Sequence, residues 1–198
     1  MTHYRAARLS HSTNRLDSRA LSAGVTVASV ACATVLTAIS AQASVTLPGS
    51  PIPFTLQPVA VLLAGLVLGA RLGALSQVLY LAAGVAGAAA FAWSPVLLPG
   101  AARLLGPSGG FLMAFPVAAG VAGLVRDRLG PGVSATALAM VVGLVALYAG
   151  GIAWASLLAP ARVTMAAFVP YAALDLVKIA LVAPLVPAAR RALFGPRS

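Results

Sequence analysis

The stretch FTLQPVAVLLAGLVLGARLGALSQVLYLAAGVAGAAA, residues 54–90, decides the fold class of this chain. It contains two apolar runs, 54–70 and 73–90, and Arg71 lies between them. Each run is close to the roughly 20 residues that an α-helix needs to cross the hydrocarbon core of a bilayer. The stretch therefore predicts two membrane-spanning helices that are joined by a short basic turn.

The composition of the whole chain favours the same class. Of its 198 residues, 61% are hydrophobic and only 8% are charged, whereas a soluble domain carries about 25% charged residues. Four further apolar runs lie at residues 20–43, 109–125, 132–158 and 171–189. The sequence therefore predicts an all-α membrane protein with six transmembrane helices over residues 20–190, a disordered basic tail at 1–19 and a second tail at 191–198.

The positions of the basic residues predict the orientation. The net charge is +10, but the cations lie at the ends of the apolar runs and form no basic face, so nucleic acid is not an expected partner. With six crossings and a cytoplasmic N-terminus, ten arginines lie inside and only Arg103 and Arg162 outside. This excess predicts that both termini are cytoplasmic. The longer outer connections, roughly 44–53, 91–108 and 159–170, are where we expect the functional face.

The first apolar run has two further features. Small residues recur at every fourth position, at Ala20, Gly24, Ala28 and Cys32. Such a face lets two helices approach closely in lipid, and it predicts either a seam inside the bundle or a docking face for a partner. The sequence Ala41-Gln42-Ala43 is typical of a signal-peptidase site, but the apolar run before it exceeds the 7–15 residues of a signal peptide. We therefore favour a retained helix over a cleaved signal.

The last apolar run contains an acid and the only lysine of the chain, Asp175 and Lys178. Residues three or four apart lie on one helical face, so Tyr171 is on the same side as this pair. Each charge costs about 2.5–3.5 kcal/mol at the membrane centre. The pair predicts either a binding site for a small zwitterionic or amide-bearing molecule, in the outer half of the helix, or a self-neutralising pair that only orients the helix.

Other residues on the outer side are candidates for the same site. Arg103 could clamp a carboxylate, unless it is a solvated loop charge. Aromatic side chains could form apolar walls, although aromatic residues near the ends of spans are more often interface anchors. These aromatic candidates are Phe54, Tyr80, Phe91 and Trp93.

Several kinds of chemistry are not indicated. The sequence has no P-loop motif, both histidines precede residue 12, and the single cysteine provides neither a disulfide framework nor a thiolate metal site. Only three acids are present, so paired carboxylates for acid–base catalysis are missing. The sequence therefore favours binding or transport over catalysis, with no cofactor and no metal.

Three motifs together resemble the BioY family, the biotin-binding membrane subunits (S-components) of energy-coupling factor (ECF) transporters. They are P-x-T-x-Q at Pro53, Thr55 and Gln57, GPSGG at Gly106 to Gly110, and D-x-x-K at Asp175 and Lys178. The resemblance covers most of residues 20–190 and implies a six-helix bundle with biotin near the outer face. It implies that Asp175 and Lys178 contact biotin and that Arg103 and the Gly106–Gly110 segment help to enclose it. Together with the candidates named above, the predicted site consists of Asp175, Lys178, Tyr171, Arg103, Gly106, Ser108, Gly109, Gly110, Phe54, Gln57 and Tyr80.

The same resemblance implies partners. ATPase subunits and a transmembrane coupling protein would drive transport, and Ala20, Gly24 and Ala28 would form the docking face for them. The protein would lie in the cytoplasmic (inner) membrane, alone, as a homo-oligomer or with these subunits. Two alternatives remain open: an S-component for another vitamin, thiamine or riboflavin, and a structural or assembly membrane protein.

Overall fold

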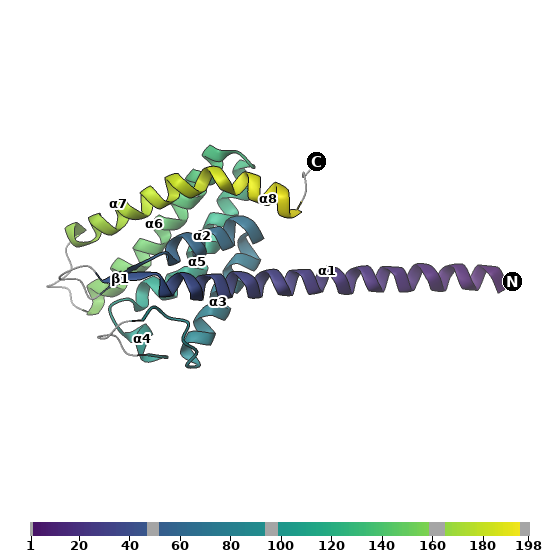
Figure 1. Ribbon diagram of the computed structural model, residues 1–198, viewed down its shortest axis with the longest axis horizontal. Helices are drawn as coiled ribbons and strands as arrows, with labels where there is room; N and C mark the ends of the chain where they lie inside the picture. The colour runs from purple at the N-terminus through teal and green to yellow at the C-terminus, as the bar shows by residue number, and fades with distance from the viewer. Residues whose placement is uncertain (1, 47–51, 94–98, 159–164, 195–198) are drawn as a thin grey trace.

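The computed structural model shows a bundle of helices, and a long N-terminal helix extends beyond it (Figure 1). The structure describes residues 2–46, 52–93, 99–158 and 165–194, and the side chains within 22–45, 52–93, 99–158 and 168–191. The elements are α1 (Thr2–Gln42), β1 (Ser44–Thr46), β2 (Pro53–Thr55), α2 (Gln57–Leu68), α3 (Ala70–Val85), α4 (Ala102–Leu105), α5 (Gly109–Leu129), α6 (Val133–Leu158), α7 (Met165–Val182), the 3-10 turn η2 (Ala183–Leu185) and α8 (Val186–Phe194).

Four helical segments of the described residues are long and apolar enough to cross a membrane. They are Ser22–Gln42, Gly109–Leu129, Val133–Leu158 and Phe168–Arg191, and they match four of the predicted runs. The helices α2 and α3 are apolar but have only 12 and 16 residues. The prediction of a helical membrane protein is confirmed, whereas the count of six crossings stays a prediction.

The helix boundaries differ from the predicted ones at several places. Helix α1 begins at Thr2 and so includes residues 2–19, for which the sequence predicts a disordered tail. The residues before Gln57 form a short antiparallel ladder with β1, in which Ser44 pairs with Thr55. Helix α3 ends at Val85 because Gly87 adopts a φ of +94°, which favours glycine and breaks the helix.

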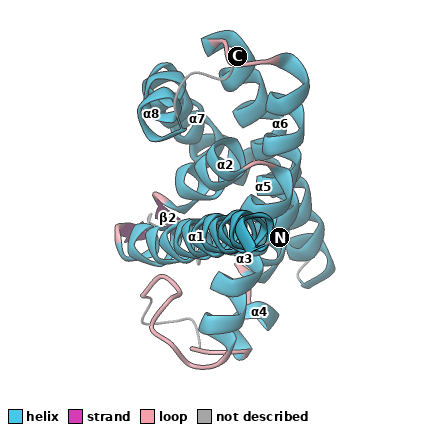
Figure 2. Cartoon of the chain, turned by 90° about the vertical axis from the view of Figure 1, so that its right-hand side faces the viewer, coloured by secondary structure: helices cyan, strands magenta, loops and turns pink. Residues whose placement is uncertain are grey.

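Small residues let the helices of the bundle pack closely. A Cβ atom added at Gly65 would lie 1.9 Å from the carbonyl oxygen of Ala119, and one at Gly123 would lie 2.5 Å from the backbone nitrogen of Ala70. The backbones of α2, α3 and α5 therefore touch, as small residues allow in membrane bundles. Figure 2 shows α2 and α5 in the middle of the bundle, with α6, α7 and α8 on one side and α1 and α3 on the other.

The two ends of the bundle differ in character. The N-terminal end of α1 and helix α8 point to one end, while β1 and α4 lie at the opposite end (Figure 1). At the first end Arg190, which is buried, donates a hydrogen bond of 2.8 Å to the carbonyl oxygen of Leu66, in the last turn of α2. A cation there satisfies a helix carbonyl and complements the helix dipole.

Candidate functional site

The predicted pair in α7 forms a buried ion pair. Lys178 Nζ lies 2.7 Å from Asp175 Oδ1, and the two side chains are 14% and 5% exposed. The ammonium also donates to the carbonyl oxygen of Thr55 at 2.7 Å and lies 3.6 Å from the centroid of the Phe54 ring. The lysine therefore joins α7 to β2, and its charge is balanced by a carboxylate, a carbonyl dipole and an aromatic face.

The second carboxylate oxygen of Asp175 has a partner that sequence reasoning missed. The hydroxyl of Tyr148, on α6, donates to Asp175 Oδ2 at 2.8 Å. The residues are 27 positions apart on different helices, so no helical periodicity relates them. The only sequence signal was a tyrosine within an apolar run, where a buried hydroxyl needs a partner.

A second group of polar side chains continues from Thr55. Its hydroxyl donates to Gln57 Oε1 at 3.2 Å and accepts from the Gln57 backbone N–H at 3.2 Å. Gln57 Nε2 in turn donates to the Tyr80 hydroxyl oxygen at 2.6 Å. Because Lys178 binds the Thr55 carbonyl, residues of both groups belong to one buried polar network from α6 and α7 to α3. We call it the polar chain: Tyr148, Asp175, Lys178, Thr55, Gln57 and Tyr80.

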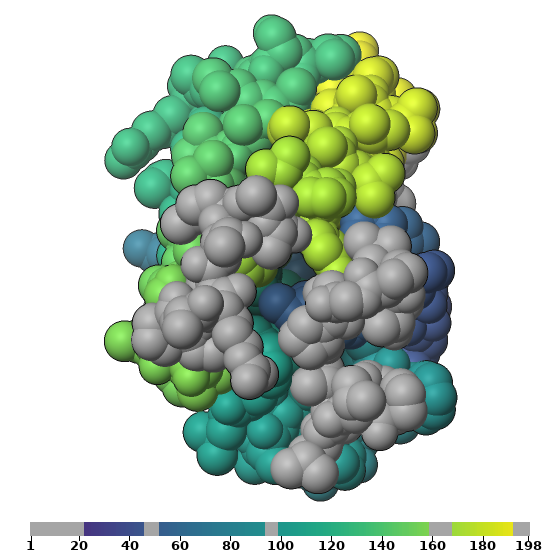
Figure 3. Space-filling view, turned by 90° about the vertical axis from the view of Figure 1, so that its left-hand side faces the viewer, coloured from purple at the N-terminus to yellow at the C-terminus, as the bar shows by residue number. Residues whose placement is uncertain are grey.

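Tyr171 lies beside this network without joining it directly. Its hydroxyl donates to the carbonyl oxygen of Ile52 at 2.9 Å, and its ring centroid is 6.1 Å from that of Phe54. The predicted face of α7 thus contacts the segment just before α2. Figure 3 looks onto this end of the molecule, where the blue surface of the β2–α2 region lies beside the yellow-green surface of α7.

Arg103 is buried rather than solvated, with 5% of the residue exposed. Its Nη2 donates to the carbonyl oxygen of Ala92. Its Nη1 is buried and has no hydrogen-bond partner among the described residues. Burial lowers the pKa of the guanidinium from its ordinary value, and the Tyr80 phenol opposes this shift. A buried, incompletely paired guanidinium is suited to an anionic group.

The glycine-rich turn before α5 is held by α4 and α6. A Cβ at Gly109 would lie 1.8 Å from the Leu104 carbonyl oxygen, and one at Gly110 would lie 2.2 Å from Trp154 Cβ. Trp154 Nε1 donates to the carbonyl oxygen of Gly106 at 3.0 Å. Packing within the protein therefore already requires these glycines. Ser108, between them, is 9% exposed.

The other aromatic candidates divide into core and surface. Phe91 is buried and meets Tyr80 edge to face, with ring centroids 5.6 Å apart. Trp93 is 72% exposed, which favours the interface-anchor interpretation.

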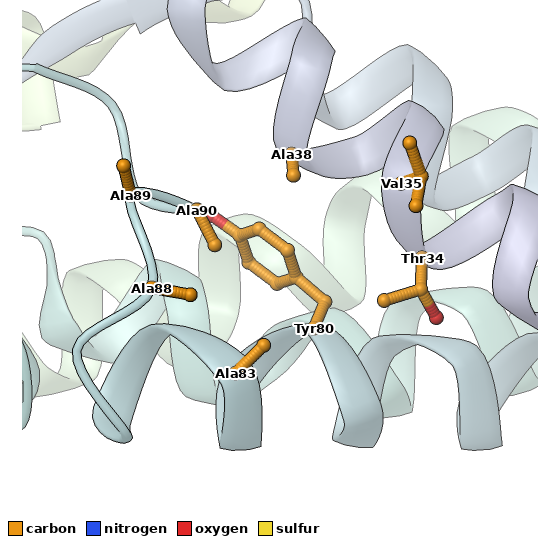
Figure 4. Close-up of a pocket in the computed structure, with 8 residues that line it drawn as sticks. All are labelled: Thr34, Val35, Ala38, Tyr80, Ala83, Ala88, Ala89 and Ala90. Carbon is orange, nitrogen blue, oxygen red and sulfur yellow. The ribbon is translucent and has the colours of Figure 1, made fainter.

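A cavity of about 270 Å³ lies between α1 and α3, and neither Asp175 nor Lys178 lines it (Figure 4). Of the predicted site residues only Tyr80 lines it, and its ring forms one wall. The remaining lining residues are Thr34, Val35, Ala38, Ala83, Ala88, Ala89 and Ala90. The walls are apolar because the Thr34 hydroxyl is bonded to the backbone of Val30 and Ser76.

The small-residue face of α1 does not form a seam inside the bundle. A Cβ built on Gly24 would have no neighbour within 4 Å among the described residues outside the adjacent backbone of α1, and Ala28 and Cys32 are exposed. The side chain of Ala20 lies outside the described ones. Within the described residues no group of three His, Cys, Asp or Glu side chains could hold a metal ion.

These features define a class: a multi-pass helical membrane protein with a buried ion pair in α7 that contacts β2. The fold is similar to the one titled "Crystal structure at 2.1 A of the S-component for biotin from an ECF-type ABC transporter", with a TM-score of 0.71 and 21% sequence identity over 89% of this chain and 94% of that one. A model of the BioY family matches residues 12–194. The chain belongs to the BioY family.

Named relatives agree with this assignment. The "Probable biotin transporter BioY" of Pyrococcus horikoshii is 41% identical over 128 residues, which cover 65% of this chain and 72% of the relative. The "Biotin transporter BioY" of Rhizobium etli is 32% identical over 79% of this chain and 92% of the relative. The "Biotin transporter BioY" of Thermotoga maritima is 38% identical over 42% of this chain and 48% of the relative.

Proposed function

We propose that this protein captures biotin with high affinity and takes it up across the cytoplasmic membrane as the substrate-binding subunit of an ECF transporter. The observation that carries the proposal is the family match over residues 12–194, which includes the D-x-x-K motif that folds into the buried ion pair. Relatives that match this chain are named biotin transporters. The protein is accordingly a transport subunit and not an enzyme.

The polar chain has the chemistry that biotin requires. The ureido ring of biotin offers two N–H donors and a carbonyl acceptor, and a carboxylate and an ammonium complement these groups. Asp175 and Lys178 supply both charges side by side. Arg103 has a buried N–H group without a partner among the described residues, which suits the carboxylate at the other end of the ligand.

Further residues complete the proposed site. Phe54 covers the ammonium of Lys178 on the β2 side, and Tyr171 packs against Phe54. Gln57 and Tyr80 extend the polar chain towards α3. We include in the site the GPSGG segment that leads into α5, with Gly106, Ser108, Gly109 and Gly110.

For the topology we propose six crossings, with α2 and α3 as the short second and third, and with both termini cytoplasmic. Support comes from the excess of arginines on one side and from the position of α8 at the same end of the bundle as the N-terminal end of α1 (Figure 1). This orientation places β1, β2 and the ion pair towards the outside.

The proposed partners are a transmembrane coupling protein and ATPase subunits. The exposed face of α1 that contains Gly24 and Ala28 supports docking, because small residues there would let a partner helix approach closely.

Binding by the purified protein tests the proposal directly. We expect retention of labelled biotin, and no retention of labelled thiamine or riboflavin at the same concentration. Retention of either other vitamin without biotin would contradict the choice of substrate. Retention of none would favour a structural role, in which the ion pair only connects α7 to β2.

A further inference from the structure

Tyr148 is the one member of the polar chain that neither belongs to the three motifs nor was predicted as a site residue. It lies in α6, outside P-x-T-x-Q, GPSGG and D-x-x-K, and its hydroxyl donates to Asp175 Oδ2 at 2.8 Å. The other carboxylate oxygen, Oδ1, lies 2.7 Å from Lys178 Nζ. The two carboxylate oxygens of Asp175 therefore have different donors, one from α7 itself and one from α6.

Two donors fix the direction of a carboxylate better than one. Lys178 lies on the same helix as Asp175, so their ion pair alone leaves the carboxylate free to rotate with respect to α6. The Tyr148 hydroxyl removes that freedom, because it approaches from a helix that α7 packs against. An ionised carboxylate accepts hydrogen bonds only, and each of its oxygens retains acceptor capacity beyond one bond.

The Tyr148 ring is itself held in place. Phe111, the residue after the GPSGG motif, meets it edge to face at 90° with centroids 5.6 Å apart. The Phe111 ring packs against Gly151, one turn further along α6, where a Cβ would lie 2.3 Å from the ring. The phenol therefore has little space to turn away, so its hydroxyl is oriented in advance.

We infer that Tyr148 is a positioning residue for ligand binding: it holds the Asp175 carboxylate in the orientation that accepts N–H donors of the ligand. The inference rests on the proposed function, because it assumes that Asp175 contacts biotin. Tyr148 itself acts through Asp175 and need not touch the ligand. It also links the carboxylate to the start of α5 through Phe111, so α6 contacts both the ion pair in α7 and the residue that follows the GPSGG motif.

A double-mutant cycle with Tyr148→Phe and Asp175→Asn tests this inference. The dissociation constant for labelled biotin is measured for the wild type, both single variants and the double variant, with biotin titrated to millimolar concentration. We expect Tyr148→Phe to weaken binding about 10-fold in the wild-type background, which corresponds to about 1.4 kcal/mol. In the Asp175→Asn background, Tyr148→Phe should change the dissociation constant for biotin less than 2-fold, because the carboxylate that Tyr148 orients is no longer present.

A control separates positioning from a general loss of a buried hydroxyl. Thr136 is fully buried on the same helix, and its hydroxyl donates to the Gly132 carbonyl oxygen at 2.9 Å near the start of α6. Thr136→Val should leave biotin affinity unchanged. If the double variant binds biotin too weakly to titrate, Asp175→Glu replaces Asp175→Asn. Glutamate keeps the charge but changes the position of the carboxylate relative to Tyr148. In the Asp175→Glu background, Tyr148→Phe should therefore also reduce biotin affinity by less than it does in the wild type.

The outcomes are distinguishable. An equal loss from Tyr148→Phe in both backgrounds, or no loss in the wild-type background, overturns the positioning role while the proposed function stands. Unchanged biotin binding by Asp175→Asn also overturns it, because there is then no carboxylate role to support. Failure of the wild type to bind biotin rejects the proposed function instead.

Discussion

Lys178→Met is the most direct test of what the buried ion pair does. Methionine keeps most of the length and apolar volume of the stem but removes the ammonium. The change deletes the 2.7 Å contact with Asp175, the 2.7 Å hydrogen bond to Thr55 and the contact with the Phe54 ring. It leaves Asp175 with the Tyr148 hydroxyl as its remaining described partner.

The magnitude follows from burial. Removing one partner of a buried ion pair typically destabilises a protein by about 3–5 kcal/mol, because the remaining charge stays desolvated. We expect the lower end, about 3 kcal/mol, since the lysine is 14% exposed and Tyr148 still donates to the carboxylate. For binding, we expect at least a 100-fold loss of biotin affinity, equivalent to about 2.7 kcal/mol, because the ligand loses a charged donor.

Stability and binding have to be measured separately. Thermal unfolding of the purified protein reports the first, and equilibrium titration with labelled biotin below the unfolding temperature reports the second. The matched control is the double variant Asp175→Asn/Lys178→Met, which buries no net charge. It should regain much of the lost stability but no biotin affinity. A folded Lys178→Met protein that binds biotin with wild-type affinity would refute the reasoning.

Three further predictions concern other parts of the molecule. Gly110→Ala should lower both the unfolding temperature and biotin affinity, because the new Cβ would lie 2.2 Å from Trp154 Cβ; unaltered unfolding would contradict the packing argument. Gly24→Leu should leave unfolding and biotin binding unchanged but reduce co-purification of the coupling protein, with the neighbouring Val25→Leu as control; equal recovery with both variants would reject this docking face. Arg103→Met should weaken biotin binding about 10-fold or more but leave binding of biotin methyl ester much less affected, as measured by competition, and an equal loss for both ligands would show that Arg103 does not read the carboxylate.

The parts of the fold that depend on local sequence could be predicted. Apolar runs of about 20 residues identify membrane-spanning helices because lipid offers no alternative partner for the backbone. The spacing of three residues between Asp175 and Lys178 places both on one helical face, and the structure confirms that they meet. The resemblance named the right family for the same reason: its motifs are local.

The parts that depend on distant contacts could not be predicted. The pairing of β1 with β2 brings Ser44 opposite Thr55, and no helical or apolar pattern marks two strands of three residues. The packing role of the glycines could not be predicted for the same reason, since the close contact of Gly110 with Trp154 joins residues that are far apart in sequence. Tyr148 has no motif around it, so only the folded chain shows that its hydroxyl binds the Asp175 carboxylate.

The polar chain imposes a condition on any ligand that enters it. Its charged members are already paired within the protein: Lys178 with Asp175 and Thr55, and Asp175 with Tyr148. A ligand must therefore exchange these hydrogen bonds for equivalent ones, since a buried polar group left without a partner costs about 1–3 kcal/mol, and more if it is charged. A simple anion could satisfy the ammonium but would leave the carboxylate facing a like charge, and a simple cation would do the reverse. A neutral group with N–H donors and a carbonyl oxygen, such as a cyclic urea, can replace the bonds of both charges at once, which is the physical reason why we propose biotin as the ligand of this network.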